Sequence, residues 1–445
     1  MIELGLSRIA RLVQSSPLPW KAIHIAGTNG KGSIASYMSA LLTAAGVRCG
    51  SFTSPHLIDR WDCLTINERV VHESIFRQIE NNVKLRNQSL GIGATEFELL
   101  TATAFEVFTH ENVKIGIVEV GMGGRLDATN ILTDNHVLVS IIAKIAYDHQ
   151  AILGDTIEKI AREKAGIMKP GVPCVVDGTN DPAVQAILEE VAKETHTPLI
   201  FARPETITQE FPELTKIFER LNIDPHQRAN IACAITALQQ KPVLSPNPTA
   251  TSTTPQSLPS LFPYIRKTPR PGRLQEISLE PLIARRQPVL LDGAHNPQSA
   301  QVLCSYVDRN FRKQPNSSAS SNSINDANSN NVTWVIAASQ GKDIQELFSC
   351  MLKPGDNVAV VEFGPVDGMP WVRSVGTAEL LSLVRSDSMP HLSRAEGFGS
   401  DILSGLKWAD ETSKGLDGGP LVIAGSLYLV SDVLRLLREE NAGVL

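Results

Sequence analysis

A glycine-rich segment near the start of the sequence carries the residue types that bind phosphate. Residues 24–33 read HIAGTNGKGS and begin in a strand-like run. Glycines let a backbone turn tightly and approach a ligand closely, and a lysine supplies positive charge for the β- and γ-phosphates of a nucleotide. The spacing departs from the common pattern G-x-x-x-x-G-K-[ST], because only two residues separate Gly27 from Gly30 and a third glycine follows Lys31. The segment indicates a nucleotide loop, and the alternative is a simple Gly/Asn turn at a helix start.

Three further polar residues follow strand-like segments and have side chains that could bind a metal ion. Glu119 lies near the end of the apolar run 115–120 (IGIVEV), where a carboxylate is costly to bury unless it is paired or metal-bound. Ser54 and His149 also follow strand-like segments. Oxygen ligands from Ser and Glu suit Mg²⁺, whereas His is a less usual ligand for that ion. A structural salt bridge at Glu119 and ordinary structural roles at the other two positions are the alternatives.

Two segments in the second half of the sequence combine a glycine turn with charged side chains. Residues 271–273 (PGR) offer Arg273, whose planar guanidinium can engage two phosphate oxygens at once. Residues 291–297 (LDGAHNP) place Asp292 and His295 between a strand end and an Asn-Pro helix start. A helix start without a function is the alternative for this second segment.

The segment 121–130 (GMGGRLDATN) invites comparison with a dinucleotide-binding turn. It begins G-x-G, but Leu126 stands where the third glycine of that fingerprint should be. The fingerprint therefore fails, which disfavours a nicotinamide-dependent oxidoreductase.

Strand-like and helix-like segments alternate along most of the chain, which is typical of a parallel sheet covered by helices. Such a sheet places its ligands at the carboxyl ends of the strands. We expect strands at residues 22–26, 113–120, 136–145, 173–177, 288–292, 332–338, 358–363 and 421–424, and helices at 33–45, 97–108, 156–165 and 298–311.

At ~100–200 residues per domain, a chain of 445 residues favours two domains. We expect the first at residues 1–286 and the second, smaller α/β domain at residues 287–445. Two polar stretches interrupt the pattern, a Ser/Thr/Pro-rich surface loop at 245–263 and a Ser/Asn-rich insertion at 316–331. The insertion has almost nothing to bury and should be disordered. A linker is expected at about 266–281.

Composition excludes several classes of protein. The net charge of −6 gives no electrostatic case for binding nucleic acid or an anionic membrane. Six thinly spread cysteines without a C-x-x-C pair favour a reducing compartment. No apolar run approaches the ~20 residues of a membrane span, and the start has neither a secretory signal nor an Arg-rich transit peptide. We expect a soluble cytoplasmic monomer, and a mitochondrial pool stays open.

The segment GTNGKGS resembles the nucleotide loop of the Mur-ligase superfamily, in particular that of the folylpolyglutamate synthase and dihydrofolate synthase family. The resemblance implies an α/β fold, with a mostly parallel sheet in a P-loop-type ATPase domain and a smaller Rossmann-like C-terminal domain. It also implies an ATP- and Mg²⁺-dependent ligase that joins L-glutamate to a pteroate or folate carboxylate. Further segments match the family in order, namely 54–57 (SPHL), 163–167 (EKAGI), 225–230 (PHQRAN), 271–273, 291–297 and 425–428 (GSLY).

The resemblance also implies roles for individual residues. Lys31, Lys164 and His295 would be catalytic, with Lys164 carbamylated, and residues 2–6 would lie near the pterin pocket. The family usually has Trp where this chain has Arg270. ATP would contact Gly27, Thr28, Asn29, Gly30, Lys31, Gly32, Ser33, Asn230, Arg273 and Asp292; Mg²⁺ would be bound by Ser54, Glu119 and His149; and the pterin pocket would include Thr95, Leu126, Asp127 and Ala128.

Three segments bear on the choice of acceptor. Residues 95–101 (TEFELLT) and 368–371 (GMPW) look like those of fungal-type dihydrofolate synthases, and residues 61–63 (WDC) stand where folylpolyglutamate synthases commonly have Arg-Glu-Arg. The resemblance therefore favours 7,8-dihydropteroate as the acceptor, giving dihydrofolate, ADP and phosphate. The alternative is a folylpolyglutamate synthase that adds γ-linked glutamates to reduced folates, or a bifunctional enzyme. A catalytically inactive relative would lack key polar residues that this chain retains.

Overall fold

The structure, a computed structural model, describes residues 4–14, 16–240, 257–265, 271–312, 331–413 and 419–443. Contacts within the chain divide it into two compact units, Met1–Pro269 and Arg270–Leu445. Most of the Ser/Asn-rich insertion expected at 316–331 and residues 245–256 of the expected polar loop lie outside the described residues. In the described part of the chain, no helix has the length and apolar character needed to cross a membrane.

The N-terminal unit contains a sheet with the strand order β4-β3-β2-β5-β1-β6-β7-β8. The neighbouring strands from β2 to β8 in this order are parallel, whereas β3 and β4 add an antiparallel edge. The strands are β1 (Lys21–Ala26), β2 (Cys49–Phe52), β3 (Leu64–Ile66), β4 (Arg69–Val70), β5 (Ile115–Glu119), β6 (Val137–Ile142), β7 (Cys174–Asp177) and β8 (Leu199–Ala202).

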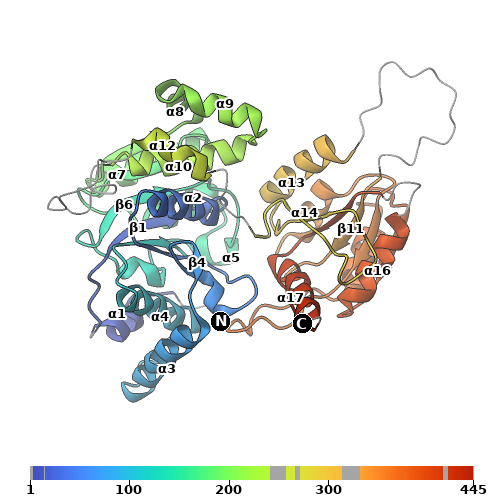
Figure 1. Ribbon diagram of the computed structural model, residues 1–445, viewed down its shortest axis with the longest axis horizontal. Coiled ribbons are helices and arrows are strands. Elements are labelled where there is room, and N and C mark those ends of the chain that lie inside the picture. Colours follow the sequence, from blue (N-terminus) through green and yellow to red (C-terminus); the bar gives the residue numbers. More distant parts are fainter. Residues whose placement is uncertain are drawn as a thin grey trace. The chain divides into compact units, whose positions relative to one another are not determined.

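Helices cover this sheet. They are α1 (Ser7–Val13), α2 (Lys31–Ala44), α3 (Glu73–Ser89), α4 (Glu96–His110), α5 (Gln150–Leu153), α6 (Ile157–Ala165), α7 (Pro182–Glu194), α8 (Pro204–Glu210), α9 (Pro212–Arg220), α10 (Pro225–Leu238) and α12 (Leu258–Ile265), with short 3-10 helices η1 (Arg60–Cys63) and η2 (Ala128–Ile131). Figure 1 shows α2, α10 and α12 on one side of β1 and α1, α3 and α4 on the other.

Strand β1 lies inside the sheet because its side chains suit burial on both faces. Ile23 and Ile25 pack into the cluster formed with α2, α10 and α12. Ala22 packs on the opposite face with α1, α3 and α4, and Ala26 packs there with α6 and α7. Successive residues of a strand point to opposite faces, so the intervening His24 shares the face of the two alanines. The candidate phosphate-binding residues therefore follow a strand whose residues 22–26 are buried.

A polar loop was expected at 245–263, but its last residues belong to helix α12 (Leu258–Ile265). The expectation was wrong for these residues. Leu261, Phe262 and Ile265 are buried against α2 and α10, and Leu258 packs beside them. The spacing i, i+3, i+4 and i+7 is that of one face of a helix. Phe262 also meets the ring of Phe211 edge to face, with 5.4 Å between ring centroids. The Ser/Thr/Pro-rich composition upstream concealed this pattern in the sequence.

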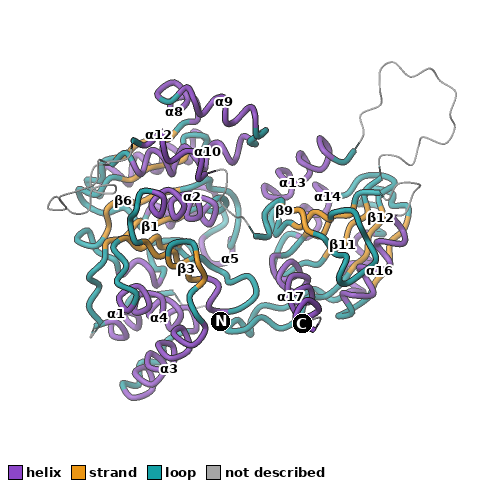
Figure 2. The backbone as a smooth tube through the Cα atoms, viewed as in Figure 1, coloured by secondary structure: helices purple, strands orange, loops and turns teal. Residues whose placement is uncertain are grey.

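The C-terminal unit contains a second sheet with the strand order β13-β12-β11-β14-β10-β9, parallel except for β9. Its strands lie among helices (Figure 2). Helix α16 contacts β11 and β12, and α17 contacts β14. The elements are β9 (Gln275–Ile277), β10 (Val289–Leu291), α13 (Pro297–Asn310), β11 (Thr333–Ile336), α14 (Ile344–Met351), β12 (Asn357–Val360), α15 (Thr377–Val384), β13 (Arg394–Gly397), α16 (Ile402–Ser413), β14 (Leu421–Ala424) and α17 (Leu427–Gly443).

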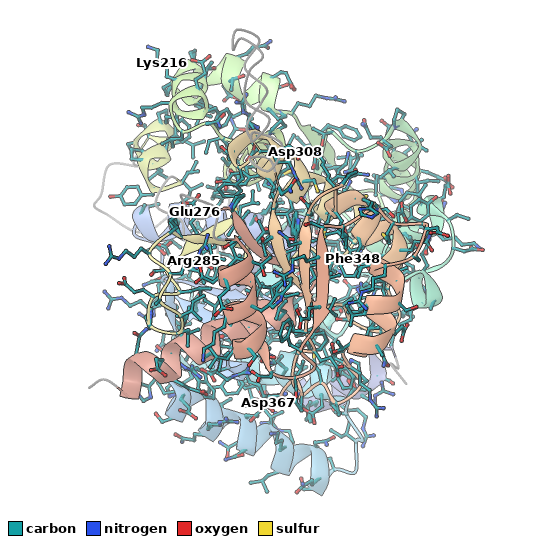
Figure 3. The ribbon with its side chains drawn as sticks, turned by 90° about the vertical axis from the view of Figure 1, so that its right-hand side faces the viewer. Lys216, Glu276, Arg285, Asp308, Phe348 and Asp367 are labelled. Atoms are coloured by element: carbon teal, nitrogen blue, oxygen red, sulfur yellow. The ribbon has the colours of Figure 1, made fainter. Side chains whose placement is uncertain are left out.

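The boundary between the units lies before the position expected from the sequence, because the segment expected to be a linker joins the C-terminal unit. Strand β9 pairs antiparallel with β10. Farther on, the buried guanidinium of Arg285, labelled in Figure 3, donates to Asp410 Oδ1 at 2.9 Å and to Ser413 Oγ at 2.8 Å. These contacts hold the chain at Arg285 against α16. The described part of the expected linker therefore includes an edge strand, which was too short to stand out in the sequence.

Candidate active site

The loop between β1 and α2 has the geometry of a phosphate cradle. Helix α2 begins at Lys31, and its N-cap residue is Gly30, which has no side chain that could cap the helix. The first backbone N–H groups of a helix have no partner within the helix, and the helix dipole favours an anion there. Before the helix, the N–H groups of Thr28 and Asn29 donate to the carbonyl of Lys144, at 2.8 and 3.1 Å. These two hydrogen bonds fix the loop to the chain just after β6.

Two glycines of this loop are required by its shape. Gly30 has a φ of +94°, and a methyl group added there would overlap the side chain of Asn230 on α10. Gly27 has a φ of +147°, and a methyl group there would lie 2.7 Å from Cβ of Ala143. Only glycine adopts such backbone conformations without strain. The structure thus places Asn230, a predicted nucleotide contact, directly beside the loop.

Lys31, Glu119 and Ser54 come together at the start of α2. Lys31 Nζ lies 3.7 Å from Glu119 Oε1, and the backbone N–H of Ser54 donates to Glu119 Oε2 at 3.3 Å. Glu119 is the last residue of β5, which pairs with both β1 and β2, so the parallel sheet brings the three strand ends to one edge. The Glu119 side chain is only 6% exposed. A buried carboxylate needs a compensating cation, and here Lys31 supplies one.

The donor set at this edge fits a Mg²⁺ ion that keeps several ligands from water or phosphate. Ser54 and Glu119 offer the hard oxygen ligands that this ion prefers. His149 lies at the start of α5, with Nε2 3.7 Å from Asp148 Oδ2. Among the described residues, no group of three or more His, Cys, Asp or Glu side chains could by itself hold a metal ion. Nucleotide-associated Mg²⁺ usually takes one or two carboxylates from the protein and its other ligands from water and phosphate.

Lys164 also reaches the nucleotide loop. It lies on α6, its Nζ donates to the carbonyl oxygen of Gly27 at 2.9 Å, and the residue is 3% exposed. Burial, with a smaller contribution from the nearby charge of Lys31, lowers the pKa of Lys164 from 10.5 to about 7. A substantial fraction of this amine is therefore neutral at neutral pH, which makes it a nucleophile.

The residues predicted for the pterin pocket are half-buried or buried. Leu126 is half-buried, and its carbonyl accepts a hydrogen bond from Gly5 N at 3.2 Å. Asp127 is only 1% exposed and caps η2. Ala128 is also buried, and Thr95 caps α4, where its hydroxyl accepts from Glu98 N at 3.3 Å. Residues 2 and 3, expected near the same pocket, lie outside the described residues.

Asp127 organises the loop that carries it. Its Oδ2 accepts the N–H of Met122 at 2.9 Å, and its Oδ1 accepts the N–H and the hydroxyl of Thr129 at 3.0 and 2.5 Å. Burial raises the pKa of Asp127, whereas these donors oppose the rise. Both oxygens of the carboxyl group therefore accept hydrogen bonds from the loop that carries it.

The C-terminal unit brings together a second group of predicted residues. Asp292 follows β10, and its two oxygens accept from Leu274 N at 2.7 Å and Ala294 N at 2.8 Å. Burial raises the pKa of Asp292, and the nearby guanidinium of Arg273 opposes the rise. The Nδ1 atom of His295 lies 2.8 Å from the carbonyl oxygen of Gly293. Because a carbonyl only accepts, Nδ1 carries the proton, and Nε2 is the acceptor nitrogen of the neutral ring.

Sequence reasoning missed two features of the N-terminal site. The Lys144 carbonyl that anchors the nucleotide loop is a backbone group, so no side-chain motif could have revealed it. The buried link from His24 to Thr129 was also missed, although a histidine within the apolar run AIHIA was a visible signal.

Comparisons with known proteins bear on the family of the chain. A family model described as "Dihydrofolate synthetase, C-terminal domain" matches residues 275–436. The chain is 36% identical over 450 residues to a protein named "Probable dihydrofolate synthetase" of Schizosaccharomyces pombe, covering 99% of each chain. It is 32% identical over 451 residues to the dihydrofolate synthetase of Saccharomyces cerevisiae, covering 98% of each.

Solved structures share the fold. E. coli FolC in complex with DHPP and ADP aligns with a TM-score of 0.72 and 23% identity, over 99% of this chain and 94% of that one. A bifunctional folylpolyglutamate synthase/dihydrofolate synthase from Yersinia pestis, complexed with AMPPNP and Mn, aligns with a TM-score of 0.70 and 24% identity, over 98% and 94% of the two chains.

The fold and the site define a nucleotide-dependent ligase built from two α/β units, which confirms the fold class expected from the sequence. The chain belongs to the dihydrofolate synthetase family, as its full-length identity to the two fungal proteins shows. The resemblance drawn from the motifs is thereby confirmed at the level of the family.

Proposed function

We propose that the protein joins L-glutamate to 7,8-dihydropteroate at the expense of ATP, giving dihydrofolate, ADP and phosphate. The meeting of Lys31, Glu119 and Ser54 at the start of α2 carries this proposal. The relatives named dihydrofolate synthetase support the choice of acceptor.

The first step makes the acceptor carboxylate reactive. A carboxylate oxygen of dihydropteroate attacks the γ-phosphorus of ATP, the bond to the β–γ bridging oxygen breaks, and ADP leaves. Lys31 and the N–H groups at the start of α2 stabilise the charge on the transferred phosphoryl group, since such transfers depend mainly on positioning and electrostatics. A divalent ion held by Ser54 and Glu119, with His149 as a further candidate ligand, would neutralise phosphate charge when bound.

The second step forms the amide. The α-amine of glutamate attacks the acyl carbon, and phosphate leaves as the tetrahedral intermediate collapses. We propose that His295 takes up the proton released by the amine, because its Nδ1–H···O=C contact leaves Nε2 as the acceptor nitrogen. Asn230, Arg273 and Asp292 are proposed as nucleotide contacts.

We also propose that Lys164 is carbamylated. Its neutral Nζ would attack the carbon of CO₂ and release one proton, which leaves a carbamate anion in place of an amine. The lowered pKa of Lys164, about 7, supports this step because only an unprotonated amine reacts with CO₂. The product could bind a metal ion or a phosphate-binding partner. Cytoplasmic location and a monomeric state also stay predictions of ours.

Purified protein supplied with ATP, L-glutamate and either dihydropteroate or tetrahydrofolate tests the proposal. We expect dihydrofolate from the first acceptor. Product formed only from tetrahydrofolate would contradict this choice and favour a folylpolyglutamate synthase, and product from both would indicate a bifunctional enzyme, for which the Yersinia pestis protein gives a precedent. The variant Lys31→Ala should lose ligation, whereas Lys159→Ala, at an exposed lysine paired with Asp155, should retain it.

A further inference from the structure

A buried histidine, His24, lies in β1 just before the nucleotide loop. It contacts Thr129, which follows the residues expected to form the pterin pocket. His24 is the polar side chain that β1 presents to the face covered by α1, α4 and α6, and it is completely buried. Its Nε2 lies 2.9 Å from the hydroxyl oxygen of Thr129. Burying the polar ring of His24 costs free energy unless the ring is hydrogen-bonded. The contact with Thr129 offsets part of this cost.

The direction of the hydrogen bonds follows from the acceptor at the far end. The Thr129 hydroxyl donates its single hydrogen to Asp127 Oδ1 at 2.5 Å. It can therefore only accept from His24, so Nε2 carries the proton of the imidazole. The other ring nitrogen, Nδ1, is buried and has no hydrogen-bond partner among the described residues. Burial lowers the pKa of His24 to about 3, so the ring is neutral and retains this tautomer at neutral pH.

The chain of hydrogen bonds from His24 through Thr129, called the relay below, ends at the carboxyl group of Asp127. This group holds the loop formed by residues 121–131. Asp127 accepts Met122 N with its other oxygen, so its carboxyl group spans the loop from residue 122 to residue 129. Leu126 and Ala128 flank Asp127 in sequence, and Asp127 itself is too deeply buried to form much of the pocket surface. A shift of the carboxyl group would move both neighbours. The relay thus connects the strand that holds the nucleotide loop to the residues expected around the pterin.

We propose that His24 and Thr129 are positioning residues for the acceptor, acting through Asp127 on the loop formed by residues 121–131. The proposal rests on the proposed function, because it assumes that this loop binds dihydropteroate. Neither residue needs to touch the substrate. Their role is to orient the Asp127 carboxyl group and thereby to fix the pocket before the acceptor arrives, which lowers the cost of ordering it on binding.

The test is a comparison of steady-state constants for three substrates. Thr129→Val removes the hydroxyl while keeping the shape, and we expect the KM for dihydropteroate to rise roughly tenfold, as loss of a hydrogen bond to a buried carboxyl group predicts. The KM values for ATP and glutamate should not change. Thr129→Ser should restore the wild-type value. The matched control is Thr103→Val, because Thr103 is equally buried but its hydroxyl donates within α4, to Leu99 O at 2.8 Å.

A second pair of variants keeps the test decisive if Thr129→Val does not fold. His24→Leu removes the donor, whereas His24→Gln retains one, so only the leucine variant should raise the KM for dihydropteroate. An unchanged KM for dihydropteroate in a folded Thr129→Val or His24→Leu protein overturns the proposal, and so does an equal rise in all three KM values. Absence of ligation by the wild-type protein would instead refute the proposed function itself.

Discussion

The buried His24 makes the stability of the N-terminal unit depend on pH in a way that can be calculated. Its pKa falls from 6.5 to about 3 because burial disfavours the charged ring, with a smaller contribution from the charge of Lys169. The unfolded chain binds a proton at this residue below pH 6.5, whereas the folded chain does so only near pH 3. The stability associated with a neutral His24 is therefore present above pH 6.5 and is lost as the pH falls toward 3.

The magnitude follows from the two pKa values. At about 1.4 kcal/mol for each pH unit over which only the unfolded chain is protonated, His24 alone removes about 2 kcal/mol of unfolding free energy between pH 7 and pH 5. Hydrogen exchange at the amides of β1, measured at both pH values and corrected for intrinsic rates, reports the opening free energy of this unit.

The matched variant is His24→Gln, which keeps a donor toward Thr129 but does not titrate. Other groups, including Lys169 and Asp127, are present in both proteins, so the difference between the two proteins isolates His24. We expect the wild type to lose about 2 kcal/mol more than the variant between pH 7 and pH 5. Equal losses in the two proteins would refute the inference that His24 is buried in its neutral form.

Three further predictions concern the nucleotide loop, the carbamate and the corrected helix. Gly30→Ala should lower the melting temperature of the nucleotide-free protein and weaken ATP binding, because the added methyl group overlaps Asn230. The control is Gly32→Ala, whose methyl group meets Glu119 Oε2 at 3.6 Å and should leave the nucleotide-free protein stable. Equal melting temperatures of the two variants would contradict the strain argument. Activity in CO₂-free buffer should recover on adding bicarbonate, more fully at pH 8 than at pH 6, since the pKa of Lys164 is about 7 and the neutral amine reacts; no response at either pH would refute carbamylation. Phe262→Ala should lower the unfolding free energy by about 3–5 kcal/mol. The control Tyr264→Ala, at a residue that is 44% exposed, should lower it only slightly. A small loss for Phe262→Ala would mean that α12 does not pack as described.

Much of the fold followed from hydrophobic runs in the sequence. The segments AIHIA and IGIVEV were predicted as strands and form β1 and β5, because a strand covered on both faces needs an almost continuous apolar run. Helix α12 was missed since its apolar face begins within a Ser/Thr/Pro-rich stretch. Strand β9 was missed because three residues at a sheet edge carry almost no pattern.

The sequence pointed to candidate site residues but not to the contacts between them. The motif identified Lys31, and a carboxylate at a strand end identified Glu119, but only the register of β1, β2 and β5 places them within 3.7 Å of each other. The contact between Lys164 and the carbonyl of Gly27 joins residues far apart in the sequence and depends on how α6 packs. The burial of Asp127 likewise arises from the packing of the whole loop.

Helix α6 limits how this protein could be redesigned. Lys164 on this helix donates to the carbonyl of Gly27, and the carbonyl of Glu163 accepts from Arg125 N at 2.9 Å in the loop formed by residues 121–131. A methyl group at Gly124 would lie 2.8 Å from the Lys164 carbonyl, so the loop and the helix fit without spare room. An engineer who grafts residues 121–131 from a relative with another acceptor preference should therefore transplant α6 as well. We predict that a graft of the loop alone would shift α6 and, with it, the contact of Lys164 with the carbonyl of Gly27.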